Sequence, residues 1–236
     1  MNKNKLTGLL LLLGALGAFV PYTILTTTFE YPQILRQDVF TILAKFNAGG
    51  SGLIFTWFTF AIMGLPLLLA YLMIGKKLEN KIPDSSMMKL ASIAGIISIV
   101  AQMIGLLRWV FVVPVLGKSM AAADTDAARE SVKISFELIH QFAGVLIGEH
   151  IGQLFTIIWT VIICIAISRT KLFSTWVSWF GIISSVIYLS AQAELFATVI
   201  DNFPVWELAG FIGSTLWLVW LIILGVKFMR LKECKN

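Results

Sequence analysis

Residues 145–168 read VLIGEHIGQLFTIIWTVIICIAIS, an apolar run with two ionisable side chains near its start, Glu149 and His150. A helix needs about 20 mainly apolar residues, each rising 1.5 Å, to cross a hydrocarbon core roughly 30 Å thick. Because lipid cannot form hydrogen bonds with the backbone, a segment of this kind is expected to be helical. The stretch therefore predicts a transmembrane helix.

Five further stretches have the same character, and none shows the alternating ten-residue pattern of a membrane β-strand. The first follows a short basic start, as in a signal peptide, but its apolar run is longer than the usual signal-peptide core, so we interpret it as an uncleaved span. The sequence predicts an all-α, polytopic membrane protein, a six-transmembrane-helix bundle that forms a single transmembrane domain over residues 1–236. The six spans are residues 6–27, 53–74, 90–116, 145–168, 176–200 and 205–229.

Composition excludes the soluble classes. Of 236 residues, 58% are hydrophobic and 13% are charged, against about 25% charged in an ordinary soluble domain. The net charge of +5 comes from Lys and Arg in short clusters between apolar runs, which is typical of a topology signal and not of a nucleic-acid surface. Two cysteines, Cys164 and Cys234, give neither a disulfide framework nor a zinc spacing.

The distribution of basic residues predicts the orientation. If the N-terminus is cytoplasmic, twelve Lys and Arg lie on the inner side, five lie outside and Arg108 falls within a span. This bias predicts a multi-pass protein of the bacterial plasma membrane with both termini in the cytoplasm. The inner residues are Lys3, Lys5, Lys76, Lys77, Lys81, Lys89, Arg169, Lys171, Lys227, Arg230, Lys232 and Lys235.

Two outer connections are long enough to contain structure. Residues 33–46 are amphipathic and precede a glycine-rich stretch, 48–52, which together indicate a short interfacial helix and a hinge before the second span. In residues 118–144, Asp124-Thr125-Asp126 resembles a helix N-cap. We expect either a long extracytoplasmic helix leading into the fourth span, or a helix on the membrane surface that bends at Gly144 or Gly148.

Ionisable residues inside the spans are few and lie at similar depths. Arg108, Glu149, Glu194 and Glu207 are each about 30 Å from the nearest basic cluster on the predicted inner side. Because an unpaired charge in hydrocarbon is costly, we expect a polar, outward-facing intramembrane pocket. Its predicted members are Arg108, which would neutralise Glu149 or Glu194, together with His150 and Gln153. The alternative is that Glu194, Glu207 and Arg108 merely reach the headgroups.

The fourth span also contains three glycines spaced four apart, Gly144, Gly148 and Gly152. This pattern is typical of close helix packing and offers a surface for a partner helix. A metal site is a second possibility, with Glu137, His140, Glu149 and His150 as candidate ligands, because Glu137 and His140 have a Glu-x-x-His spacing. On a straight helix the two histidines lie about 15 Å apart, so this site needs a kink. No cofactor is strongly indicated.

Several short motifs resemble a family of bacterial and archaeal integral membrane proteins catalogued as domain of unknown function 4386. The resemblance implies a multi-span membrane protein of similar length, and it implies no activity, substrate or cofactor. The motifs cover nearly the whole chain: Phe29-Glu30-Tyr31-Pro32 with Leu35-Arg36, Gly49-Gly50, Leu107-Arg108-Trp109, Gly148-Glu149-His150-Ile151-Gly152 and Trp217-Leu218-Val219-Trp220.

Three functions remain open at this point. The first is a transporter-like or ligand-binding protein whose pocket takes a small polar or cationic ligand. The second is a membrane-embedded metal-binding protein or enzyme, although no catalytic motif indicates one. The third is an accessory subunit of a membrane complex that packs through its glycine-rich face. All three place the chain in a lipid bilayer, and none involves nucleic acid.

Overall fold

The computed structural model describes residues 2–82 and 85–232, and this part of the chain is helical with no strand. Six stretches are long and apolar enough to cross a membrane, which confirms the predicted all-α polytopic architecture. The helices are α1 (Lys3–Thr28), η1 (Gln33–Arg36), α2 (Val39–Ile62), α3 (Gly64–Glu79), α4 (Ser85–Phe111), α5 (Val113–Ala122), α6 (Asp126–Ile139), η2 (His140–Ile151), α7 (Gly152–Thr170), α8 (Thr175–Ser190), α9 (Gln192–Ala197) and α10 (Ala209–Arg230). Cys234 and Lys235 lie outside the described residues.

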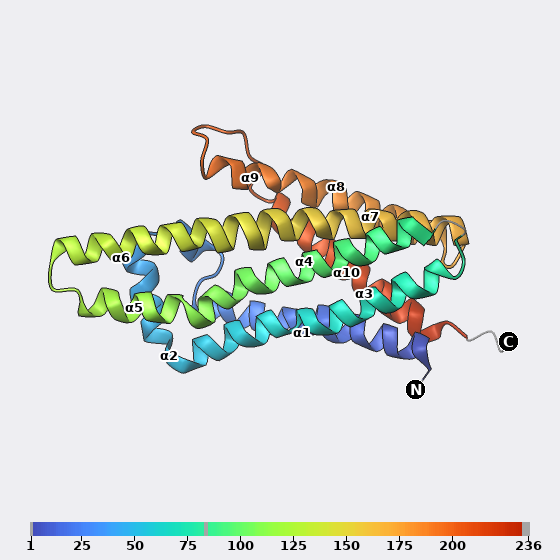
Figure 1. The fold of residues 1–236 in the computed structure, drawn as a ribbon, viewed down its shortest axis with the longest axis horizontal. Coiled ribbons are helices and arrows are strands. Elements are labelled where there is room, and N and C mark those ends of the chain that lie inside the picture. The colour runs from blue at the N-terminus through green and yellow to red at the C-terminus, as the bar shows by residue number, and fades with distance from the viewer. Residues whose placement is uncertain (1, 83–84, 233–236) are drawn as a thin grey trace.

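The long helices form an elongated bundle with both termini at the same end (Figure 1). We call this the terminal end; it also carries the α3–α4 and α7–α8 connections. We call the other end the distal end. Around the bundle, α1 packs against α3 and α10, α8 packs against α7 and α10, and α4 packs against α3 and α7. The six spans therefore form a closed ring of neighbours.

Two apolar clusters fill this ring. In the terminal half, the ring of Trp159 stacks on Tyr71 at 3.6 Å and meets Trp220 edge-on at 5.8 Å. In the distal half, Trp57 and Trp109 stack at 4.9 Å, and Phe29 meets Trp109 at 5.5 Å. Aromatic and aliphatic side chains therefore pack together in both halves of the bundle.

The first part of α2 runs across the bundle before the chain turns back along it (Figure 1). Asp38 caps this helix by accepting hydrogen bonds from the Thr41 hydroxyl and amide, and these bonds lower the pKa of the Asp38 carboxyl. The helix breaks at Gly50, whose φ of 53° and ψ of −149° lie in a region essentially restricted to glycine. The predicted short helix and hinge are therefore confirmed, with the helix beginning at Val39 after a turn at residues 33–36.

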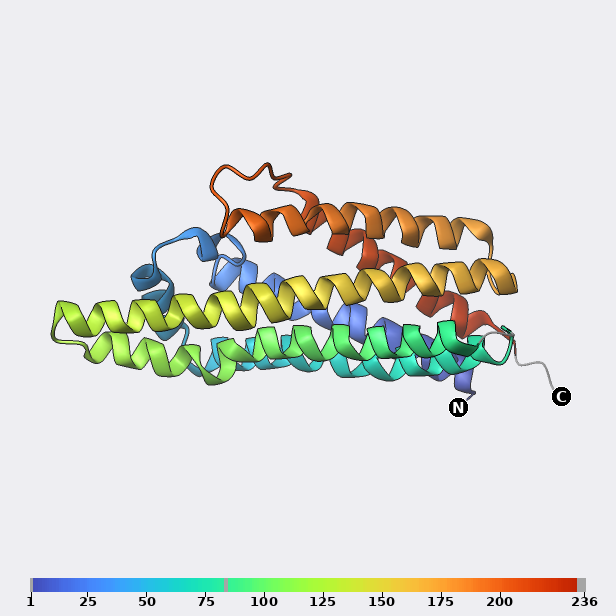
Figure 2. The ribbon, with the colours of Figure 1, turned by 45° about the horizontal axis from the view of Figure 1, so that its top comes forward.

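The fourth span is the terminal part of a much longer helix. Thr125 accepts a hydrogen bond from the Ala128 amide, as the N-cap prediction required. From Asp126 the chain stays helical to Thr170, and Figure 2 shows α6, η2 and α7 as one continuous rod. This confirms a long helix leading into the fourth span and rejects the alternative with a bend at Gly144 or Gly148.

The ends of three spans differ from the prediction. The third span is interrupted at Val112 and continues as α5 to Ala122, so Lys118 is helical rather than part of a loop. The fifth ends at Ala197 and the sixth begins at Ala209, because residues 198–208 are not helical. Glu207 consequently lies in an exposed connection, not inside a span.

The hinge yields a matched test with two glycine substitutions. A methyl group at Gly50 would meet no atom within 4 Å, so Gly50→Ala tests backbone conformation alone. We expect it to destabilise the protein by about 1–3 kcal/mol, measured as a lower unfolding temperature in detergent. Gly52→Ala is the control, because that site is equally open and helical. Equal unfolding temperatures for the two variants would contradict the assignment of the hinge to Gly50.

Candidate functional site

Arg108 is the charged side chain buried most deeply among the described residues, with 7% of its surface exposed. Its Nη1 donates a hydrogen bond to the Gly105 carbonyl, and its Nη2 lies 3.4 Å from His140 Nδ1. Its Nε has no hydrogen-bond partner in the described part of the chain. The guanidinium is therefore held by a backbone carbonyl and an imidazole rather than by a carboxylate.

Glycines make room for this arginine between α4 and η2. A methyl group on Gly144 would lie 2.6 Å from Arg108 Nη2, and one on Gly148 would lie 2.9 Å from the Gly105 Cα. The spacing of small residues in the fourth span thus lets two backbones touch and lets the guanidinium lie against η2. The face that Gly144, Gly148 and Gly152 form is covered by α4 of the same chain.

Glu149 lies near Arg108 without pairing with it. The carboxylate is half-buried and within electrostatic range of the guanidinium, but the two are not within 4.0 Å, and no described residue forms a hydrogen bond with Glu149. Tyr31, in the α1–α2 connection, lies within electrostatic range of both Arg108 and Glu149. Burial raises the pKa of the Tyr31 hydroxyl, and the Glu149 carboxylate raises it further. Tyr188 of α8 is in electrostatic range of Glu149 too.

We call Arg108, Glu149, Tyr31, Tyr188 and His140 the distal polar cluster. Four elements supply it: the α1–α2 connection, α4, η2 and α8. His140 and Glu149 both belong to η2, which winds as a π-helix over twelve residues. Such winding is rare and occurs frequently at functional sites.

Three side chains joined by hydrogen bonds lie next to this cluster in the sequence and in the fold. His150 Nδ1 is 2.6 Å from Gln192 Oε1, and Gln192 Nε2 donates to Gln153 Oε1 at 2.6 Å. The predicted members His150 and Gln153 are therefore brought together, through a residue that was not predicted to belong to the site. The spacing of the sequence does mark Gln192: Ser178, Gly181, Ser185, Tyr188 and Gln192 recur at helical intervals and form a polar stripe on the fifth span.

Further toward the terminal end, polar side chains of neighbouring spans form hydrogen bonds with one another. Ser98 and Thr156 share a 2.6 Å hydrogen bond, and Gln102 donates to both at 3.0 Å. Trp217 donates to the Thr160 hydroxyl at 3.1 Å. These hydrogen bonds join α4, α7 and α10 and provide partners for polar side chains that lipid could not satisfy. We therefore assign a structural role to these side chains.

The expected ion pair of Arg108 with Glu194 is not formed. Glu194 lies on the short helix α9, is partly exposed, and pairs instead with Arg36 of η1 at 3.1 Å. The reason is a turn at Ala191, which separates α9 from α8 and carries Glu194 toward the distal surface. A second contact holds α9 nearby, because Gln141 of η2 donates to the Thr198 hydroxyl at 2.9 Å.

The four candidate metal ligands do not converge. Across residues 2–82 and 85–232, no group of three or more His, Cys, Asp or Glu side chains could hold a metal ion. Glu137 is exposed on α6, His140 stacks on Phe136 at 5.6 Å, and His150 faces Gln192. The kink that the metal hypothesis needed is absent from the continuous α6–η2–α7 rod.

One family model matches this chain: it covers residues 6–225 and is described as a domain of unknown function, DUF4386. Neither the curated proteins nor the solved structures contain a match.

The contact between α4 and η2 can be tested by adding one methyl group. In Gly148→Ala the new methyl meets the backbone of Gly105, which cannot move aside, so we expect a destabilisation of about 1–3 kcal/mol. Gly210→Ala is the control, because its methyl would meet neighbours only at 3.8 Å and beyond. Thermal unfolding in detergent measures both. A Gly148→Ala variant as stable as the control would refute the close approach.

Proposed function

Because the chain belongs to the DUF4386 family, whose description assigns no activity, we propose a function from its own residues: the distal polar cluster binds a small polar solute. The protein is a multi-pass membrane protein with six spans. Within that frame, we propose that it acts as a transporter or as a membrane receptor for such a solute.

The observation that carries this proposal is the incomplete pairing of Arg108 and Glu149. Each charge is within a span, where an ionised side chain costs at least about 2.5–3.5 kcal/mol. A buried pair normally offsets that cost by direct contact and full hydrogen bonding. Here Arg108 has an unpartnered Nε and Glu149 has no hydrogen bond from a described residue. A bound solute would supply what the two side chains lack.

The chemistry of the two groups defines the solute. A guanidinium donates to an anionic or carbonyl oxygen, and a carboxylate accepts from an ammonium, amide or hydroxyl. A small molecule with both an acceptor and a donor or cationic group is complementary to Arg108 and Glu149. The hydroxyls of Tyr31 and Tyr188, which lie near Glu149, are further hydrogen-bond donors for such a solute.

Access from the distal side would pass the contacts of α9. The Arg36–Glu194 pair is 61% and 43% exposed on its two side chains, and an exposed pair contributes only about 0–1 kcal/mol. The Gln141–Thr198 bond is exposed as well. Since α9 has only six residues and is followed by an eleven-residue non-helical connection, these weak contacts suit a segment that opens and closes.

Two other functions have less support. A metal-binding protein or enzyme would need ligands that converge, whereas the two candidate histidines contact different neighbours, His140 lying against Phe136 and His150 against Gln192. An accessory subunit that packs through Gly144, Gly148 and Gly152 would need a face that α4 already covers.

For the orientation, we propose that the terminal end lies in the cytoplasm of a bacterial plasma membrane. The support is the excess of Lys and Arg at that end of the bundle, since basic loops stay preferentially on the cytoplasmic side.

Ligand binding is tested by thermal unfolding of the purified protein with glycine, γ-aminobutyrate, choline or glycine betaine at millimolar concentration. We expect at least one of these probes to stabilise the wild type, by about 2.7 kcal/mol at a hundredfold excess over the dissociation constant. Arg108→Gln and the isosteric Glu149→Gln should lose this effect. Glu207→Gln, which removes an exposed carboxylate, should retain it. Failure of all four probes, or an unchanged response in Glu149→Gln, would disprove the proposal.

Orientation is tested by cysteine labelling in a Cys234→Ser background, in which Cys164 is buried. Asp124→Cys lies at the tip of the α5–α6 hairpin and Ser174→Cys lies in the α7–α8 connection, and both positions are exposed. A membrane-impermeant maleimide should label position 124 in intact cells and position 174 only after lysis. The reverse pattern would invert the proposed topology.

A further inference from the structure

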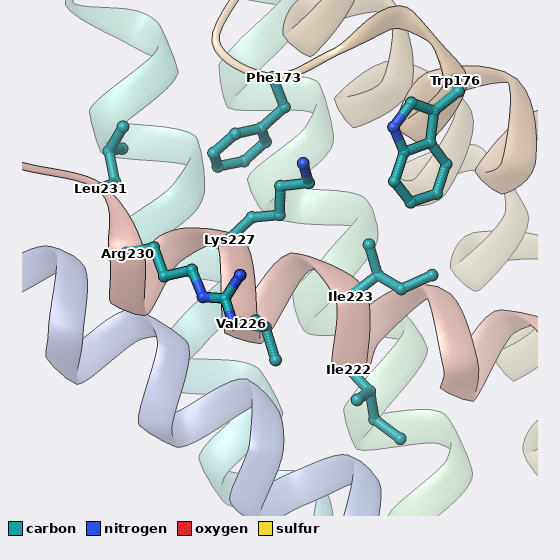
Figure 3. Close-up of a pocket in the computed structure, with 8 residues that line it drawn as sticks. All are labelled: Phe173, Trp176, Ile222, Ile223, Val226, Lys227, Arg230 and Leu231. Carbon is teal, nitrogen blue, oxygen red and sulfur yellow. The ribbon is translucent and has the colours of Figure 1, made fainter.

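At the terminal end, an open groove of about 420 Å³ lies between α10 and the start of α8 (Figure 3). It is on the opposite end of the bundle from the distal polar cluster. Its lining combines two basic side chains, two aromatic rings and a row of aliphatic side chains. These residues are Phe173, Trp176, Ile222, Ile223, Val226, Lys227, Arg230 and Leu231.

The basic side chains of the groove have no acidic partner among the described residues. Lys227 and Arg230 are one turn apart on α10, and neither forms an ion pair with a described carboxylate. Figure 3 shows the Lys227 ammonium reaching toward Trp176, and its Nζ lies 5.4 Å from the ring centroid. The Lys227 charge is thus held beside an exposed indole, and Arg230 lies one turn further along α10.

The aliphatic part of the groove leads away from these charges. From Arg230 to Ile222 the helix rises about 12 Å toward the middle of the bilayer, and Val226, Ile223 and Ile222 line that path. Trp176 is 50% exposed, as expected of an interfacial anchor at the headgroup level. The groove therefore has a cationic end at the membrane surface and an apolar length within the hydrocarbon.

We propose that this groove binds one anionic phospholipid. Its phosphate accepts hydrogen bonds from Lys227 and Arg230, and an acyl chain covers Val226, Ile223 and Ile222. Basic pockets on the faces of transmembrane bundles recognise anionic headgroups in this way. A free phosphate ion would satisfy the two charges but would leave the apolar wall of the groove uncovered, so the lipid fits better.

Native mass spectrometry of the detergent-purified protein tests this proposal. We expect the wild type to retain one molecule of phosphatidylglycerol in preference to phosphatidylcholine. In the double variant Lys227→Gln/Arg230→Gln, phosphatidylglycerol binding should weaken by about fivefold for each charge removed, which corresponds to about 1 kcal/mol per basic residue. The control is Lys81→Gln/Lys89→Gln, which removes two exposed charges from the same end of the bundle but outside the groove.

Three outcomes would overturn the lipid site. One is equal retention of the two lipids by the wild type. Another is equal loss of phosphatidylglycerol in the groove variant and in the control, which would indicate a general surface charge. The third is competition by inorganic phosphate at millimolar concentration that removes the bound phosphatidylglycerol, because the apolar wall would then contribute nothing. None of these results bears on the distal polar cluster.

Discussion

The approach of α4 to η2 at Gly105 and Gly148 is the contact on which the distal half of the molecule depends. Hydrocarbon gives helices no hydrophobic reason to associate, so they associate through close packing and hydrogen bonds between them. Two glycines in register allow the backbones to touch. With the helices this close, the Arg108 side chain is buried against Gly144 and its guanidinium reaches His140. A bulkier pair would separate the helices and leave that charge facing lipid.

The sequence was sufficient for features that depend on neighbouring residues. Apolar run length predicted the six spans, Thr125 predicted the start of the long helix that leads into the fourth span, and the glycines near Gly50 predicted the hinge. Each of these follows from a few consecutive side chains and their backbone preferences. The predicted first span, residues 6–27, likewise lies within a single helix, α1.

The partners of the polar side chains were not predictable in the same way. Equal depth in the membrane suggested Arg108 and Glu194 as partners, but pairing also requires the helices to be rotated toward one another. Two local changes alter that rotation: η2 winds as a π-helix, so positions counted at 3.6 residues per turn drift off their face, and the turn at Ala191 redirects α9. Neither the π-helical winding of η2 nor the turn at Ala191 can be recognised from a single sequence. Gln192 shows the opposite case, since its place in the polar stripe of the fifth span was visible from spacing alone.

The long helix formed by α6, η2 and α7 also affects how this protein could be imaged. Its 45 residues extend about 68 Å, roughly twice the thickness of the hydrocarbon core. Together with α5 it forms a stiff hairpin that extends beyond the other helices at the distal end (Figure 2). Membrane proteins of 26.2 kDa are difficult to align in electron micrographs because a detergent micelle hides most of their shape. An antibody fragment raised against this hairpin would stand clear of the micelle on a rigid stalk and would fix the orientation of every particle.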